Sequence, residues 1–433
     1  MKVLIVSNNV ISNTNNMGKT LKAYFSAFGP EELAQFYIHA QRPTDRSICQ
    51  NYYRFTDLDA LKSIVSPGRR GKVFRAADIV EDDSAVGEDM GRARVLYDVG
   101  SRKTPLMHLG RNLVWRLGRW FTPELKVWLN EVSPDVIFFA SGDSVFMYDI
   151  ALRFAEYLQV PLITSCYDDY YVYDINENRA FAGLLHRALL RRARRVFARS
   201  VFATTVCETM AVAYSELFGT PCHVLYTGAK ESGLPLNPEG RQISYLGNLS
   251  LDRYRQLMDM GRALQQLERR EEPTGIDVYS GTQDGKIIAE LTAAPGIRFH
   301  GAVSPEEVQR VMARSMAVIH TESFGEKYQN RVRFSVSTKI AESLMSGPCL
   351  LAYGARGIAS FDYLAENRAA FVIDRPEQLE DGLRMLIEHP EQRAQILRRA
   401  RALARKNHSL EGNAALLRRW IEEAVHEGQG IAP

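Results

Sequence analysis

The residues best suited to do chemistry lie in one segment near position 340. Ser337 is a good helix N-cap, and Gly347 followed by a proline is a good helix stop, so a helix is predicted between them. Lys339 and Glu342 are three positions apart and therefore point the same way. One face of this helix would hold Ile340, Ala341, Leu344 and Met345, and the opposite face Lys339, Glu342, Ser343 and Ser346.

This arrangement suits a nucleotide diphosphate. The start of a helix offers free backbone N–H groups and a positive dipole end to an anion, and Lys339 would add a full positive charge. Glu342, one turn further in, would accept hydrogen bonds from both ribose hydroxyls. Because the diphosphate is a leaving group, positive charge here would stabilise its departure without a metal. The alternative is an ordinary helix with a solvated polar face.

Short apolar runs that alternate with longer amphipathic stretches predict an α/β protein with two Rossmann-like halves. The expected buried parallel strands are residues 3–6, 136–139 and 161–164, then 243–246, 276–279, 317–320 and 349–352, and a helix is expected at 18–28. A Gly- and Pro-rich stretch separates the halves. The predicted domains are 1–229, a linker at 230–242, a second domain at 243–410, and a helix at 411–433 that packs back on the first domain. Since open α/β sheets bind ligands at the carboxyl ends of their strands, a cleft between the halves is expected.

Residues 337–352 resemble the donor-binding segment of the family 4 retaining glycosyltransferases, which have the GT-B fold. Glu342 matches the second glutamate of that family's E-x7-E pattern, which binds the ribose. The position of the first glutamate is occupied by Phe334. Glu322 and Glu326 lie upstream and are therefore the candidate contacts to the donor sugar.

Other segments extend the resemblance along most of the chain. Residues 245–249 are similar to the first strand and glycine turn of the family's donor domain, where the nearest basic residue here is Arg253. The resemblance implies that 1–229 faces the acceptor and 243–410 binds the nucleotide sugar. The expected donor-binding residues are Gly247, Asn248, Gly281, Ser337, Thr338, Lys339 and Glu342.

The N-terminal half supplies further candidates. Gly18 begins a Gly-Lys-Thr triplet, but a P-loop would need glycine at Asn13, so a P-loop-like phosphotransferase is kept only as an alternative. In the resembled family a glycine-rich loop here touches the donor diphosphate and the acceptor, and Gly18 fits that role. Asp143 and Asp169 follow predicted strands and would orient the acceptor, unless they lie in solvated turns. Together with Lys339 these residues form the candidate catalytic set.

The composition argues against several classes of function. The net charge of +3 over 433 residues argues against nucleic acid as a partner. The five cysteines are scattered and no C-x-x-C occurs, which is typical of a reducing cytoplasm. The first apolar run is too short for a signal peptide, and no run approaches the ~20 residues that span a bilayer. No metal-ligand spacing is present, so neither a metal nor another cofactor is expected beside the nucleotide-sugar substrate.

Two segments combine arginines with apolar or aromatic residues. The first holds Arg187, Arg191, Arg192, Arg194, Arg195 and Arg199, and the second holds Arg111, Trp115, Arg116, Arg119, Trp120 and Phe121. Such segments lie on anionic membrane surfaces, which would suit a lipid-linked acceptor at the inner face of the plasma membrane. The alternative is a solvated basic helix face, or arginines that pair with acids elsewhere in the fold.

The sequence therefore predicts a cytoplasmic glycosyltransferase that moves a sugar from a nucleotide diphosphate sugar to a glycan or lipid-linked acceptor in cell-surface polysaccharide synthesis. The resemblance implies retention of anomeric configuration. Two alternatives stay open: the P-loop-like phosphotransferase, and a catalytically inactive membrane-surface binding protein with the same fold.

Overall fold

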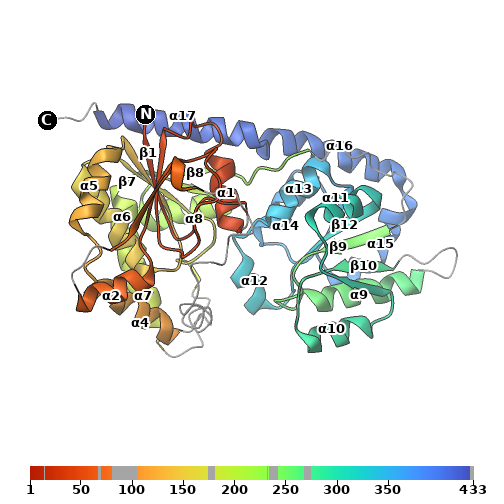
Figure 1. Ribbon diagram of the computed structural model, residues 1–433. Helices are drawn as coiled ribbons and strands as arrows, with labels where there is room; N and C mark the ends of the chain where they lie inside the picture. The colour runs from red at the N-terminus through yellow and green to blue at the C-terminus, as the bar shows by residue number, and fades with distance from the viewer. Residues whose placement is uncertain are drawn as a thin grey trace. The chain divides into compact units, whose positions relative to one another are not determined.

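The chain divides into two compact units, shown with their elements in Figure 1. The computed structural model describes residues 1–13, 15–66, 70–79, 105–173, 181–231, 233, 242–267 and 275–429. One unit comprises Met1–Leu225 with Asn413–Pro433, and the other comprises Tyr226–Gly412. The observed boundary at Leu225 lies slightly before the residue 229 expected from sequence. Most of the expected linker at 230–242 lies outside the described residues.

The first unit is built on an eight-stranded sheet with the order β4-β3-β2-β1-β5-β6-β7-β8. All neighbouring strands are parallel except β3 and β4. The strands are β1 Val3–Ser7, β2 Leu33–Tyr37, β3 Asn51–Arg54, β4 Lys72–Arg75, β5 Val136–Ala140, β6 Leu162–Ser165, β7 Ser200–Thr205 and β8 Cys222–Val224. The strand order reverses between β1 and β5, which makes their carboxyl ends the topological switch point of this sheet.

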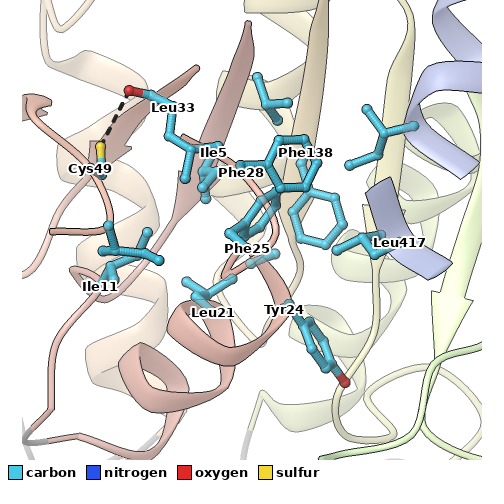
Figure 2. Packing of buried hydrophobic residues seen from close by; sticks show 14 of the residues in the cluster. Ile5, Ile11, Leu21, Tyr24, Phe25, Phe28, Leu33, Cys49, Phe138 and Leu417 are labelled. Atoms are coloured by element: carbon cyan, nitrogen blue, oxygen red, sulfur yellow. Dashed lines mark hydrogen bonds between the residues drawn. The ribbon is translucent and has the colours of Figure 1, made fainter. Parts of the chain in front are cut away.

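Helices cover both faces of this sheet. They are α1 Asn16–Tyr24, α2 Asp57–Val65, α4 Pro105–Leu117, α5 Pro123–Val132, α6 Val145–Leu158, α7 Ala182–Arg199, α8 Glu208–Phe218 and, from Asn413 onward, α17 Leu410–Gln429. Figure 2 shows one core, in which Phe25 and Phe28 pack with Phe138 of β5 and Leu417 of α17. The opposite face packs on α6, for example where Phe36 of β2 meets Phe154 edge-on at 5.1 Å.

The first helix is shorter than the predicted 18–28. It ends at Tyr24, and Phe25 caps it by donating its backbone N–H to Leu21. The chain then turns, which lets Phe25 and Phe28 both enter the core. The sequence predicted a helix through Phe28, whereas a turn directs these two side chains inward.

The second unit contains a fully parallel six-stranded sheet with the order β11-β10-β9-β12-β13-β14. The strands are β9 Gln242–Leu246, β10 Ile276–Tyr279, β11 Ile297–Gly301, β12 Ser315–Thr321, β13 Cys349–Tyr353 and β14 Phe371–Ile373. The predicted strands are confirmed to within a few residues at their ends. The order reverses between β9 and β12, so a ligand site is expected at the carboxyl ends of these two strands.

Period-two burial divides the core of the second unit into two layers. Ala317 and Ile319 of β12 face one layer, whereas Val318 faces the other. The first layer is covered by α9 Arg253–Leu267, α10 Gly285–Thr292 and α15 Leu379–Glu388. The second is covered by α11 Pro305–Arg314, α13 Thr338–Ser346, α14 Ala359–Glu366 and α16 Pro390–Asn407. Both faces are buried, as parallel sheets require.

All five cysteines are free thiols. Within the described part of the chain, no helix combines the length and the apolar character that a membrane crossing demands.

Candidate active site

A hollow opens at the switch point of the second unit, where β9 and β12 end side by side. Its empty space is about 840 Å³ when the open mouth is counted. Its polar lining comes from the turn after β9, the end of β12 and the first turns of α13: Asn248, Arg253, His320, Thr321, Glu322, Ser337, Lys339, Glu342 and Ser343. Residues far apart in sequence thus converge where the fold places a ligand.

The predicted helix at position 340 is confirmed as α13. Ser337 is its N-cap and its hydroxyl accepts from the backbone N–H of Lys339, while Gly347 caps the other end. The predicted apolar face is buried, with Ile340, Ala341, Leu344 and Met345 all in one core cluster. Ser343 was assigned to the polar face, and this was wrong in part, because Ser343 is buried while still touching the hollow. The helix packs against both β13 and α16.

Lys339 projects from the first turn of α13 into the hollow. Its ammonium donates to the backbone carbonyl of Leu246, the last residue of β9. Burial of the ammonium lowers the pKa of Lys339, the nearby Arg253 lowers it further, and Glu342 opposes both. A cation that is costly to hold in the empty hollow gains most from an anionic ligand.

A buried ion pair forms the floor of the hollow. Arg253, the first residue of α9, donates two hydrogen bonds to Glu322, with its Nε 2.8 Å from Oε2 and an Nη 2.7 Å from Oε1. Both side chains are largely buried. Burial raises the pKa of Glu322, although Arg253 opposes that shift. The pair therefore fixes the end of β12 against the start of α9.

His320 contributes a neutral ring to the same lining. Its Nε2 lies 3.0 Å from the hydroxyl of Ser360. Burial, reinforced by the charge of Arg253, lowers the pKa of His320 to about 3. The imidazole is therefore uncharged near neutral pH and adds no further positive charge.

A second hollow adjoins the first and shares Gly247, Asn248 and Lys339 with it. Most of its other lining residues come from the end of β10 and the loops after β10 and β11, namely Tyr279, Ser280, Gly281, Thr282, Ala302 and Val303. Gly247 is required by close packing, because a Cβ atom there would lie 2.5 Å from the Tyr245 hydroxyl. That hydroxyl donates to the carbonyl of Asn248 at 2.6 Å, which fixes the turn.

The structure brings most of the expected donor-binding residues together. Five of them line the first hollow: Gly247, Asn248, Ser337, Lys339 and Glu342. Gly281 lines the second hollow, and Thr338 lines neither of the two. Their roles in binding a donor stay predictions.

The structure places the two candidate sugar contacts in different surroundings. Glu322 lines the first hollow with Glu342, whereas Glu326 begins the exposed helix α12 (Glu326–Val332) and lines neither hollow. Phe334, at the position where the family pattern places an acid, is buried. Thr321 was missed by sequence reasoning, and His320 was interpreted from sequence as a packed or capping residue; the available signal was their place at the end of a strand beside the switch point.

The candidates in the first unit are held by local bonds. The N–H of Gly18 donates to the side chain of Asn15 at 2.6 Å, and a Cβ atom at Gly18 would lie 2.6 Å from the carbonyl of Val10. Packing thus explains this glycine, and its engaged N–H is not the open phosphate cradle that a P-loop needs. Asp143 lies beside Ser144, whose hydroxyl is 3.2 Å from its carboxylate.

Asp169 serves the loop that follows β6. Its carboxylate accepts the backbone N–H groups of Tyr171, Val172 and Tyr173, each at 3.0 Å, and the hydroxyl of Tyr214 at 2.8 Å. These four bonds use most of the acceptor capacity of a carboxylate. The predicted acceptor roles of Gly18, Asp143 and Asp169 remain untested. Across the described ranges, no three His, Cys, Asp or Glu side chains are grouped to hold a metal ion.

Comparison with known proteins relates the second unit to glycosyltransferases. A family model described as "Glycosyl transferase-like" matches residues 254–419. No curated protein matches the chain. Residues 254–419 include α13 and the residues after β12, so the family match covers much of the lining described above.

Solved structures match the chain over nearly its full length. HepE of Anabaena in complex with UDP-glucose is 12% identical, with a TM-score of 0.59 over 98% of this chain and 100% of that one. Sucrose-phosphate synthase of Thermosynechococcus elongatus is 9% identical, with a TM-score of 0.59 over 98% and 99%. A UDP-forming trehalose-phosphate synthase of Burkholderia xenovorans is 13% identical, with a TM-score of 0.56 over 98% and 100%. The chain thus has the GT-B fold of glycosyltransferases.

Proposed function

We propose that this chain is a glycosyltransferase that binds a nucleotide diphosphate sugar at the first turn of α13. The observation that carries the proposal is the hollow at the switch of β9 and β12, where a helix N-terminus, Lys339 and Glu342 meet. The glycosyl transferase-like family match over residues 254–419 and the GT-B fold support it.

The diphosphate would lie against the start of α13. Backbone N–H groups there and the ammonium of Lys339 supply hydrogen bonds and positive charge to the leaving group. In the empty hollow that ammonium rests on the carbonyl of Leu246, so it must exchange one neutral acceptor for a charged one. Charge-assisted hydrogen bonds are the stronger kind, and this favours the exchange.

The nucleoside would occupy the remaining space. The carboxylate of Glu342 accepts from the ribose hydroxyls, as the family resemblance implies. The base would enter the second hollow near Gly281, which is continuous in its lining with the first. We propose uridine as the nucleoside, because HepE, which shares the fold, was solved with UDP-glucose.

The chemistry we propose is sugar transfer with retention and without a metal. Lys339 and the N-terminus of α13 would stabilise the departing diphosphate in place of a cation. The acceptor would be a glycan or lipid-linked precursor, with Gly18, Asp143 and Asp169 of the first unit on its side of the reaction. The enzyme would act in the cytoplasm.

Calorimetric titration tests this proposal directly. UDP, GDP and ADP are titrated with and without EDTA, and turnover is measured with the corresponding sugar nucleotides. We expect UDP to bind most tightly, EDTA to have no effect, and Glu342→Gln and Lys339→Met to weaken binding at least tenfold. Glu380→Gln and Lys327→Met are matched controls, because both residues are exposed, on α15 and α12, and line neither hollow.

The other outcomes separate the alternatives. Magnesium-dependent phosphate release from ATP would indicate a phosphotransferase. Tight UDP binding without turnover of any sugar nucleotide would indicate an inactive relative. No nucleotide binding, or equal binding by the Glu342 and Lys339 variants, would remove the site assignment.

A further inference from the structure

Helix α4 carries an apolar stripe that faces solvent. Leu106, Leu113 and Leu117 are 69%, 55% and 56% exposed, and their spacing places them on one side of the helix. The opposite side holds Trp115, which is buried and stacks on Phe146 of α6 at 4.4 Å. The helix is therefore anchored by one face, while a second, separate apolar face points outward.

The neighbouring helix α2 continues this apolar surface. It packs against α4. Val65, its last residue, is 87% exposed, and Leu61 one turn earlier is 46% exposed. Five large apolar side chains exposed on two packed helices are more than the scattered single residues that are normal on protein surfaces.

Helix α7, which also packs against α4, supplies positive charge. Its buried face includes Leu189, Ala193 and Val196. The solvent-facing side holds Leu184, Arg187, Arg191, Arg194 and Arg195. Among the described residues, Arg192 is the member of this helix that forms an ion pair, with Asp149 of α6 at 3.4 Å.

The acids that these three helices themselves carry are already engaged. Neither α4 nor α7 contains an acidic residue. On α2, Asp57 accepts from Arg111 and from the indole N–H of Trp115, and Asp59 closes the capping box with Thr56. Within the described residues, these outer faces therefore combine exposed leucines with α7 arginines that form no ion pair there, namely Arg187, Arg191, Arg194 and Arg195, although the whole chain carries a net charge of only +3.

We propose that this basic apolar face, formed by the outer sides of α2, α4 and α7, docks on an anionic lipid surface. Leucines can enter the boundary between headgroups and acyl chains while guanidinium groups bind lipid phosphates. Charge complementarity favours an anionic occupant, and the apolar stripe favours a bilayer over a nucleic acid, whose backbone gives leucines nothing to pack against. The inference is independent of sugar transfer, because it rests on a surface of the first unit alone.

Vesicle co-sedimentation of the full chain tests the proposal. The protein is mixed with phosphatidylcholine vesicles or with vesicles that also contain phosphatidylglycerol, at low and high salt and without nucleotide. We expect binding to the anionic vesicles that falls as salt rises, and little binding to the neutral ones. The double variants Leu113→Glu/Leu117→Glu and Arg191→Glu/Arg194→Glu should each bind at least tenfold more weakly.

Matched controls introduce the same number of acidic residues elsewhere. Val127→Glu/Val212→Glu alters two exposed valines, on α5 and α8, and Arg398→Glu/Lys406→Glu reverses two exposed cations on α16; both double variants should bind vesicles like the wild type. Unchanged melting temperatures and unchanged UDP binding would show that the variants are folded. The proposal is overturned by absent binding to anionic vesicles, by equal binding to both vesicle types, or by normal binding of the two double variants. A change in oligomeric mass of the leucine variants, without loss of vesicle binding, would assign the stripe to self-association and overturn it as well.

Discussion

The two units are built alike but use the carboxyl edges of their sheets differently. In the second unit, Lys339, Glu322 and Glu342 line an open hollow at the switch of β9 and β12. In the first unit, Gly18 in the first turn of α1 and Asp169 in the loop after β6 are held by neighbouring backbone and side chains. A polar residue at the end of a strand is therefore not enough to identify a ligand-binding site. The difference lies in whether its hydrogen-bonding groups face a hollow or hold the loop on which they stand.

The largest effect is expected at the ion pair of the second unit. Arg253→Met leaves Glu322 buried without its cation, and we expect a loss of about 3–5 kcal/mol in the free energy of unfolding. The double variant Arg253→Met/Glu322→Leu should recover much of that loss. Urea denaturation of both variants measures it. If the double variant were as unstable as the single one, the pair would not be acting as a unit.

Next in size is the effect of Lys339 on donor binding. Lys339→Met removes a charge-assisted hydrogen bond to the diphosphate, so UDP binding should weaken about 10- to 100-fold. Stability should change little, because burial already lowers the pKa of this ammonium in the empty hollow. Calorimetry alongside thermal unfolding separates the two quantities. A large stability loss with unchanged UDP affinity would place Lys339 among the structural residues, as Asp169 is placed in the first unit.

In the first unit we expect a smaller effect, on stability and not on UDP binding. Asp169→Asn replaces an acceptor-only carboxylate that binds three backbone N–H groups, and we expect a stability loss of about 1–3 kcal/mol with UDP affinity unchanged. Asp168→Asn is the matched control, since it changes the adjacent carboxylate. Full stability together with lost turnover would reverse the assignment and make Asp169 an acceptor-side residue.

The smallest effect concerns acid sensitivity of the second unit. His320 has a folded pKa of about 3, below its ordinary value of 6.5, so the unfolded chain binds a proton more readily between these values. Stability from the neutral His320 is therefore present above about pH 6.5 and is lost as pH falls toward 3. His320→Asn should show a smaller drop in melting temperature between pH 7 and pH 5 than the wild type. Equal drops would mean that this ring is not held neutral by burial.

The strands and α13 could be predicted because their signals are local. Apolar runs marked the β-strands, and Ser337 with Gly347 marked both ends of α13. The buried state of Ser343 could not be predicted in this way, because burial depends on the tertiary packing around α13 and not on local sequence.

The second acid that lines the hollow, beside Glu342, also could not be predicted from the sequence pattern. Counting back along the family pattern leads to Phe334, which is buried, whereas the acid that lines the same hollow is Glu322. Helix α12 lies between the two glutamates and breaks the expected spacing. Likewise, Arg253 and Glu322 are 69 residues apart, and only the adjacency of β9 and β12 brings them together.

Hydrogen exchange with and without UDP tests the central claim most directly, because it reads backbone N–H groups in both units at once. A diphosphate resting on the start of α13 should slow exchange in peptides covering residues 337–343, while peptides covering Asn16–Tyr24 of α1 should exchange as in the free protein. Slowed exchange confined to α1, or none at α13 under saturating UDP, would contradict the account.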